Sequence, residues 1–249
     1  MTLAILSALP DEQSGLLPCL LRPERVVRAG RTFTRGLLHG QPVVLALSGI
    51  GKVAAATTAA ALIEHFGVAR IVFTGVAGGV GEGVNVGDVV VAQDYLQHDM
   101  DASPLFARWE LPGYARTRLA CDAAMSALLL EAASAFVSSA SGLFDQNYPD
   151  ARVHHGLIVS GDRFVSAAWE SDRLRDDLRA AGHAVLAVEM EGAAVAQVCH
   201  DYGVPFAAVR TISDRADDAA HVDFPVFVQT VASRYADHMV QVLLKKLRN

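Results

Sequence analysis

Short runs of valine, isoleucine, leucine and alanine recur along the chain, separated by longer stretches in which apolar and polar residues mix. A short unbroken apolar run is typical of a strand buried on both faces, and the longer stretches are typical of helices. The pattern predicts strands over 3–8, 26–31, 32–39, 43–48, 70–74, 88–95, 156–160, 184–188 and 206–211. It predicts helices over 11–21, 52–66, 119–137, 169–180, 191–202 and 224–247.

Strands that alternate with helices in this way predict an α/β protein whose mostly parallel sheet carries helices on both faces. The composition agrees, because 52% of the 249 residues are hydrophobic and only 19% are charged, which suffices for a large core. No linker rich in proline, glycine and serine divides the chain, so we expect one domain over residues 1–249. The irregular segment 97–116 predicts a loop that serves function or covers a partner.

Charge, hydropathy and cysteine usage argue against several classes of protein. A net charge of −6 disfavours a nucleic-acid partner, which usually meets a basic face. The apolar stretches are too often interrupted for a transmembrane helix, and the amino terminus lacks the basic lead of a signal peptide. Three widely spaced cysteines without a CxxC pair predict reduced thiols and a cytoplasmic protein. The histidines are scattered, so neither a metal site nor a cofactor is expected.

Two glycine-rich turns follow predicted strands. Ser48-Gly49-Ile50-Gly51 opens the predicted helix 52–66, and Thr74-Gly75-Val76-Ala77-Gly78-Gly79 follows the strand 70–74. Such turns let backbone N–H groups and a helix N-terminus face a ligand, but each is also explained as a tight turn that needs positive φ or close packing. Their occurrence at successive strand ends favours a pocket at that edge of the sheet.

Carboxylates also gather at predicted strand ends. Glu12 follows the first strand, Glu189 and Glu191 follow 184–188, and Asp214 follows the strand 206–211. Each alone is explained as a helix cap or as an acid that stabilises a first helical turn. Parallel strands, however, bring their carboxyl ends to one edge of a sheet, so Glu12, Glu191 and Asp214 are expected to converge. Carboxylates in one site suit acid–base chemistry, because burial and neighbouring charges move their pKa values apart.

Five motifs occur in order along the chain, at 48–56, 75–79, 156–164, 188–191 and 209–214. Together they resemble the nucleoside phosphorylase/nucleosidase superfamily, and most of all its bacterial 5′-methylthioadenosine/S-adenosylhomocysteine nucleosidases. The resemblance runs from the first strand to the last helix and is weakest over 97–153. It implies a three-layer α/β/α sandwich around a mixed, partly barrel-like sheet, and a homodimer.

The resemblance implies hydrolysis of the N-glycosidic bond of those two nucleosides, with release of adenine. Glu12 matches the general base that activates water, and Asp214, supported by Ser213, matches the acid that protonates N7 of the purine. Glu191 matches the acceptor for the ribose hydroxyls, and Arg210 is expected near the water and Glu12. The chemistry agrees, because an oxocarbenium-like transition state needs a carboxylate near the sugar, a proton for the leaving base and a positioned water.

The resemblance also implies a pocket for the substrate. Phe164 would stack on adenine, Val165 would offer backbone groups to the base, and Met190 would pack beneath the sugar. On the residues alone, Phe164 and Val165 are better explained as core. Leu9, Ile50 and Phe224 are the expected apolar positions around the 5′ substituent. Glu189 is a further expected contact, and so is Val76, which stands where such nucleosidases usually carry serine. Phe106 and Pro112 are expected to reach the pocket of a partner subunit.

Water and phosphate are the two candidate nucleophiles. Phosphorylases hold phosphate with arginines and glycine-rich loops, whereas the segment 7–12 carries acids and no arginine, which favours water. Four alternatives stay open: a true phosphorylase, a sister hydrolase such as a futalosine hydrolase, a nucleoside-binding protein without catalysis, and a redox enzyme. The last is disfavoured, because no acid follows the first glycine turn by about 20 residues, where a dinucleotide ribose needs one.

Overall fold

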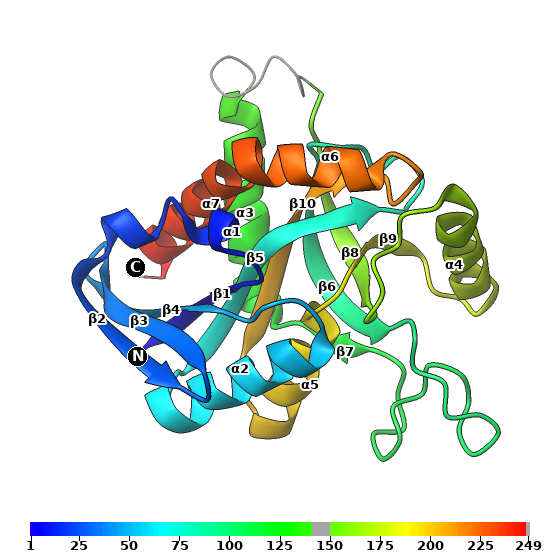
Figure 1. Cartoon of the computed structure of the whole chain (residues 1–249), viewed down its shortest axis with the longest axis horizontal. Coiled ribbons are helices and arrows are strands. Elements are labelled where there is room, and N and C mark those ends of the chain that lie inside the picture. Colours follow the sequence, from blue (N-terminus) through cyan, green and yellow to red (C-terminus); the bar gives the residue numbers. More distant parts are fainter. Residues whose placement is uncertain (141–149, 248–249) are drawn as a thin grey trace.

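A ten-stranded sheet forms the centre of the protein in the computed structural model, which describes residues 1–140 and 150–247 (Figure 1). The strands lie in the order β10-β6-β8-β9-β5-β1-β4-β3-β2, with β7 beside β6. The strands are β1 Leu3–Ser7, β2 Leu21–Arg28, β3 Arg31–Leu38, β4 Gln41–Leu47, β5 Arg70–Gly79, β6 Val89–Gln97, β7 Leu119–Ala120, β8 Val153–Ser160, β9 Val185–Glu189 and β10 Phe206–Asp214. The α-helices are α1 Pro10–Gln13, α2 Lys52–Phe66, α3 Ala123–Ala140, α4 Ala168–Ala180, α5 Gly192–Tyr202, α6 Ala220–Phe227 and α7 Ser233–Lys246.

Five strands close on themselves, because β5 pairs with both β10 and β9 while β6 and β8 connect those two. β5 is long enough to serve both neighbours: Ile71 to Gly78 pair with β10, and Gly78 and Gly79 pair with β9. The strands β1, β4, β3 and β2 extend from β5 as an open sheet that ends at β2. We call the closed set β5, β10, β6, β8 and β9 the ring, and the open set the wing. The ring is the barrel-like part that the family resemblance implies.

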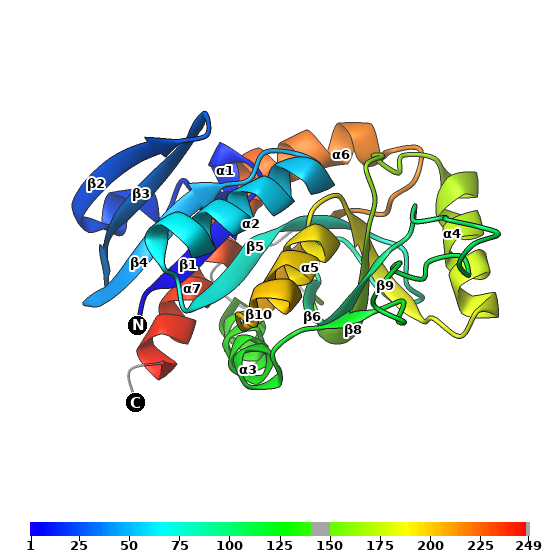
Figure 2. The same cartoon turned by 90° about the horizontal axis from the view of Figure 1, so that it is seen from below.

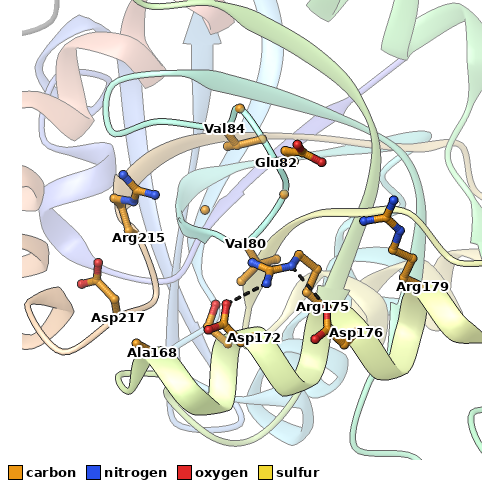
Figure 3. A pocket seen from close by; sticks show the side chains of 14 residues that line it. Val80, Glu82, Val84, Ala168, Asp172, Arg175, Asp176, Arg179, Arg215 and Asp217 are labelled. Carbon is orange, nitrogen blue, oxygen red and sulfur yellow. Dashed lines mark hydrogen bonds and ion pairs between the residues drawn. The ribbon is translucent and has the colours of Figure 1, made fainter.

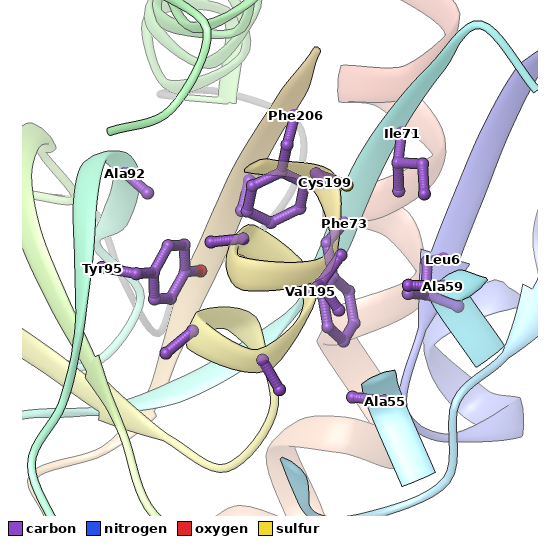
Figure 4. Close-up of a cluster of buried hydrophobic side chains, with 14 of the residues drawn as sticks. Leu6, Ala55, Ala59, Ile71, Phe73, Ala92, Tyr95, Val195, Cys199 and Phe206 are labelled. Atoms are coloured by element: carbon purple, nitrogen blue, oxygen red, sulfur yellow. The ribbon is translucent and has the colours of Figure 1, made fainter. Parts of the chain in front are cut away.

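Helices cover both faces of the sheet. In Figure 1, α2 and α5 lie below the sheet and α1, α6 and α7 lie above it, and Figure 2 shows α2 and α5 side by side. α2 packs on α5, and α3 packs on α7. Small side chains allow the close approach of α2, because Ala55 and Ala59 join Phe73 of β5 and Val195 of α5 in one buried cluster (Figure 4). This layered arrangement confirms the predicted α/β fold class.

The sheet is mixed, with as many antiparallel as parallel pairings. In the wing, β2, β3 and β4 follow one another as a meander, so their pairings are antiparallel. In the ring, β10 and β6 and also β5 and β9 run antiparallel where the sheet closes. Parallel strands therefore do not predominate as strongly as the continuous apolar runs suggest.

The helix boundaries differ from the predicted ones in three places. The helix expected over 11–21 ends at Gln13, and a short 3-10 turn at Leu17–Cys19 follows, because Pro18 lacks the N–H that a longer helix needs. The helix expected from 119 begins at Ala123, since the two residues of β7 pair with β6. The helix expected over 224–247 is divided by a π-helical stretch, Val228–Ala232, into α6 and α7.

Two strands are longer than predicted, because they include glycines and an acid that were expected to follow them. The glycine-rich segment 75–79 belongs to β5, and the residues up to Asp214 belong to β10, because the two segments pair with each other. The predicted irregular segment 97–116 is present, with one isolated bridge between Leu111 and Arg116. Across the described ranges, no helix combines the length and the apolar character needed to cross a bilayer.

Candidate active site

A cavity of about 270 Å³ lies where the ring meets the wing, at the carboxyl ends of β1, β5, β9 and β10. The sequence expectation that acids at these strand ends converge is met in the geometry, because Glu12, Glu191 and Asp214 all line this one cavity. The expected substrate contacts that line it as well are Leu9, Ile50, Val76, Phe164, Val165, Glu189, Met190, Ser213 and Phe224. Such a wall of apolar side chains around a few polar groups is typical of a small-molecule site.

Glu12 is held by the backbone on three sides. The N–H groups of Ala8 and Leu9 donate to its Oε2 at 2.8 Å each, and the N–H of Val76 donates to its Oε1 at 3.0 Å. Gly75 leaves room for this carboxylate, because a Cβ there would lie 2.7 Å from Glu12 Oε1. Burial raises the pKa of Glu12, while the backbone hydrogen bonds and the charge of Arg210 oppose the rise. The carboxylate is therefore held in a fixed position, and its pKa lies above the usual value for glutamate.

Asp214 ends β10 inside the same cavity. The Ser213 hydroxyl donates to its Oδ2 and the Ala216 N–H donates to its Oδ1, both at 2.8 Å. Gly78 of the neighbouring β5 is required, because a Cβ there would lie 2.9 Å from Asp214 Oδ1. Burial is the main cause that raises the pKa of Asp214. A raised pKa favours the protonated form of a carboxyl group, which is the form that a general acid needs.

Glu191 is the residue immediately before α5, and its side chain contacts the glycine turn that precedes α2. Its Oε1 accepts the Gly51 N–H at 2.9 Å, and the side chain is nearly buried. Burial and then the adjacent charge of Glu189 raise the pKa of Glu191 to about 8. In the described part of the chain, its other oxygen has no hydrogen-bond partner. That oxygen is available to a ligand.

Arg210 is buried close enough to Glu12 for its charge to act on that carboxylate. It is 1% exposed, does not line the cavity, and forms an ion pair of 2.7 Å with Glu189 Oε2. Glu189 also accepts the Ser160 hydroxyl and the N–H groups of Glu191 and Gly192. The guanidinium lies 4.0 Å over the ring of Phe73. The charge of Arg210 therefore acts on Glu12 although the side chain does not line the cavity. Glu189 lines the cavity, but its carboxylate already accepts hydrogen bonds from protein groups.

The first glycine turn brings the N-terminus of α2 against two carboxylates of the protein itself. Gly51 N–H donates to Glu191, and Lys52 N–H donates to Asp162 Oδ1 at 2.7 Å. Gly49 and Gly51 have φ of 72° and 96°, which glycine adopts without strain. A helix N-terminus is a ready anion site, and this one is already occupied by the carboxyl groups of Glu191 and Asp162.

A larger hollow of about 510 Å³ lies between the loop after β5 and helix α4 (Figure 3). Its charged side chains have both signs, and Arg175 pairs there with Asp172 and Asp176. None of the three expected catalytic acids lines it. The smaller cavity is therefore the candidate active site. Among the described residues, no group of three or more histidines, cysteines and carboxylates is placed to hold a metal ion.

Comparison with known proteins identifies the family. The model of the phosphorylase superfamily matches residues 2–248. The chain belongs to the phosphorylase superfamily. A 5′-methylthioadenosine/S-adenosylhomocysteine nucleosidase of Shewanella denitrificans is 35% identical over 250 residues, which cover 99% of this chain and 100% of that protein. One from Exiguobacterium is 37% identical over 255 residues, covering 99% of both chains.

Solved structures of superfamily members agree with this result. The nucleosidase of the same name from Neisseria meningitidis, in complex with methylthio-immucillin-A, has a TM-score of 0.87 and 35% identity, covering 98% of this chain and 99% of that one. The futalosine hydrolase of Helicobacter pylori has a TM-score of 0.84 and 29% identity, covering 99% and 98%. The predicted superfamily, and the prediction of an N-glycosyl hydrolase of the nucleosidase type, are confirmed.

Besides Arg210, two expected site residues of this superfamily member lie apart from the cavity. Phe106 and Pro112 belong to the irregular segment 97–116 and do not line the cavity of their own chain. This segment is fastened to α2, because Asp99 accepts Lys52 Nζ at 2.6 Å and the Asp162 N–H at 2.9 Å. Their role at a partner's pocket stays a prediction.

Sequence reasoning missed several residues of the cavity wall. Four of them are small or apolar residues close in sequence to expected positions, and the fifth is an arginine: Ala8, Ala77, Gly78, Val188 and Arg163. Ala77 and Gly78 were assigned to a loop, and their place in β5 shows only from the pairing with β10. Arg163 directly precedes Phe164, the residue expected to stack on adenine, and only this adjacency in the sequence could have indicated that Arg163 lines the cavity.

Proposed function

We propose that the protein hydrolyses the N-glycosidic bond of 5′-methylthioadenosine and S-adenosylhomocysteine and releases adenine. The observation that carries this proposal is the meeting of Glu12, Glu191 and Asp214 at one cavity from three separate strand ends. The names of the relatives and of the Neisseria structure support the choice of substrates.

Each acid has one task in the proposed mechanism. Asp214 donates a proton to N7 of the purine, which its raised pKa favours, while the hydrogen bond from Ser213 orients the carboxyl group. Glu191 binds the ribose hydroxyls with the oxygen that accepts no hydrogen bond from the described residues. Glu12 takes a proton from the attacking water as the sugar becomes oxocarbenium-like. The charge of Arg210 stabilises the ionised form of Glu12, as its effect on the pKa of Glu12 indicates.

Water is the proposed nucleophile because the anion-binding elements near the cavity are already engaged. The N-terminus of α2 holds Glu191 and Asp162, and Arg210 is neutralised by Glu189. A phosphate ion would meet acids at each of these places. We expect equal rates of adenine release in phosphate-free buffer and in buffer with phosphate. A strict requirement for phosphate would identify a phosphorylase instead.

The 5′ group is proposed to enter the apolar part of the wall. Leu9, Ile50 and Phe224 line it, and Phe224 packs edge-on against Phe164 with ring centroids 5.6 Å apart. Ile50 is 60% exposed, so one side of this wall is open to a second subunit. We propose a cytoplasmic homodimer in which Phe106 and Pro112 of one subunit complete the pocket of the other.

The futalosine hydrolase structure makes that activity the second candidate. A panel of 5′-substituted adenosines, other purine nucleosides and futalosine, scored for free base, separates the two. We expect 5′-methylthioadenosine and S-adenosylhomocysteine to have the highest kcat/KM. Faster cleavage of futalosine would establish the alternative, and tight binding of every nucleoside without release of base would indicate a silent binding protein.

A further inference from the structure

The hairpin of β2 and β3 carries the opposite charge from the rest of the chain. Residues 22–35 contain five arginines and one glutamate, whereas the whole chain has 27 acidic and 21 basic residues. We call this segment the arginine hairpin. It lies at one end of the molecule, and α4 lies at the other (Figure 1, Figure 2). Its arginines are Arg22, Arg25, Arg28, Arg31 and Arg35.

Most of these arginines lack a carboxylate partner. Arg35 pairs with Glu24 at 2.7 Å, and this is the one ion pair of the hairpin in the described structure. Arg25 donates to the Thr32 hydroxyl, while Arg28 and Arg31 donate to backbone carbonyls at the turn. The positive charge of the surface is thus largely uncompensated.

Two features of the hairpin oppose its own folding. Arg28 and Arg31 stand directly opposite each other across the strands, and like charges at such positions are destabilising. Arg22 has a φ of 52°, in the left-handed region that residues with a side chain rarely adopt. Edge strands are commonly protected by charged residues, but that protection does not require one sign or an opposed pair. The arrangement instead indicates a negatively charged ligand.

The backbone of β2 is also available to a ligand. β2 is the last strand of the sheet and pairs with β3 alone, so its outer edge presents free N–H and C=O groups. Pro23 has no N–H and the pairing register shifts between Leu21 and Glu24, so the regular free edge covers residues 24–28, roughly 16 Å. A groove of about 440 Å³ lies over β2, β3 and β4 near the end of α2, and its charged wall residues are Arg22, Arg35 and Glu24.

We propose that the arginine hairpin binds an extended acidic segment of a partner protein. The segment adds as a strand to the outer edge of β2, and its carboxylates meet the arginines. Nucleic acid fits this surface less well, because Phe33, the sole aromatic residue of the hairpin, is fully buried and offers no face for a base.

The test uses the full chain and a fluorescent peptide of alternating glutamate and threonine, measured by fluorescence anisotropy at low salt. The double variant Arg28→Glu/Arg31→Glu keeps like charges opposed, so it reverses the charge without adding a new folding cost. We expect it to weaken binding at least about tenfold. The matched control Arg173→Glu/Arg179→Glu changes two exposed arginines of α4, and binding is expected to stay unchanged.

A second probe separates strand addition from charge attraction alone. The same peptide with all internal amides N-methylated keeps its charge but cannot donate hydrogen bonds to an edge strand. We expect it to bind at least about tenfold more weakly. Equal binding by native and reversed proteins, equal binding of the methylated peptide, or tighter binding of a single-stranded DNA of the same charge would each overturn the proposal. Adenine release in the Arg28→Glu/Arg31→Glu variant is expected to equal that of the native protein, since the hairpin does not line the cavity.

Discussion

The ring and the wing differ in where their charged side chains lie: they are buried at the ring and exposed on the wing. The acids at the mouth of the ring and Arg210 are buried, and each is held by backbone N–H groups, a hydroxyl or an ion pair. The arginines of the wing lie largely in solvent with few partners. A buried charge must be compensated, and it gains a shifted pKa and a fixed position. An exposed charge needs no compensation, and its field stays available to a partner. In the proposals above, chemistry takes place where the ring meets the wing, and the recognition of other molecules takes place at the outer strands of the wing.

The largest effect is expected from Asp214→Asn in the ring. The amide cannot donate the proton that the purine needs, so kcat should fall about 10²- to 10⁴-fold. Adenine release measures this loss, and the melting temperature controls for folding. Native-like turnover in a folded Asp214→Asn protein would remove Asp214 from the mechanism.

The next prediction compares one arginine from each region. Arg210→Met leaves Glu189 buried without its ion pair, which should lower the free energy of unfolding by about 3–5 kcal/mol. Arg35→Met breaks an exposed pair with Glu24 and should cost about 1 kcal/mol or less. Urea denaturation of both variants gives the two values. Similar losses for both would contradict the contrast between ring and wing.

A smaller effect is expected from pH. The pKa of Glu191 is raised to about 8 in the folded protein, so the folded state binds a proton that the unfolded state has lost. The contribution of Glu191 should therefore reduce stability as pH rises from its unfolded pKa toward about 8. Glu191→Gln should flatten this slope in melting curves of the ligand-free protein. An unchanged slope would show that another group causes it.

The smallest effect is expected in the wing itself. Arg28→Thr removes the opposition to Arg31 and places a residue with high strand preference in β2, so the protein should become more stable by about 0.2–1 kcal/mol. Differential scanning calorimetry measures the change. Destabilisation would mean that Arg28 makes a favourable contact within the hairpin.

Sequence patterns predicted the parts of the fold that depend on local physics. Continuous apolar runs marked the buried strands, and the acids that follow these runs led to the cavity because strand ends meet. The pairing of Arg210 with Glu189 was not predictable, because both were expected as separate site residues and only the folded sheet brings β9 and β10 close enough for the ion pair. The link between Gly51 and Glu191 likewise joins residues from two distant helix starts.

The closure of the ring could not be predicted from the sequence either. A continuous apolar run indicates a buried strand but does not indicate which strands it pairs with. In addition, β5 was expected to end at Thr74. Its glycine-rich continuation resembles a loop in composition. Only the pairing of that continuation with β10 and β9 makes it a strand.

Because β5 pairs with β1 of the wing and with β10 and β9 of the ring, it belongs to both regions at once. Neither region can melt without exposing the hydrogen-bonding edge of this shared strand. The two therefore unfold as one cooperative unit, and the amides of β5 should be among the last in the molecule to exchange with deuterium.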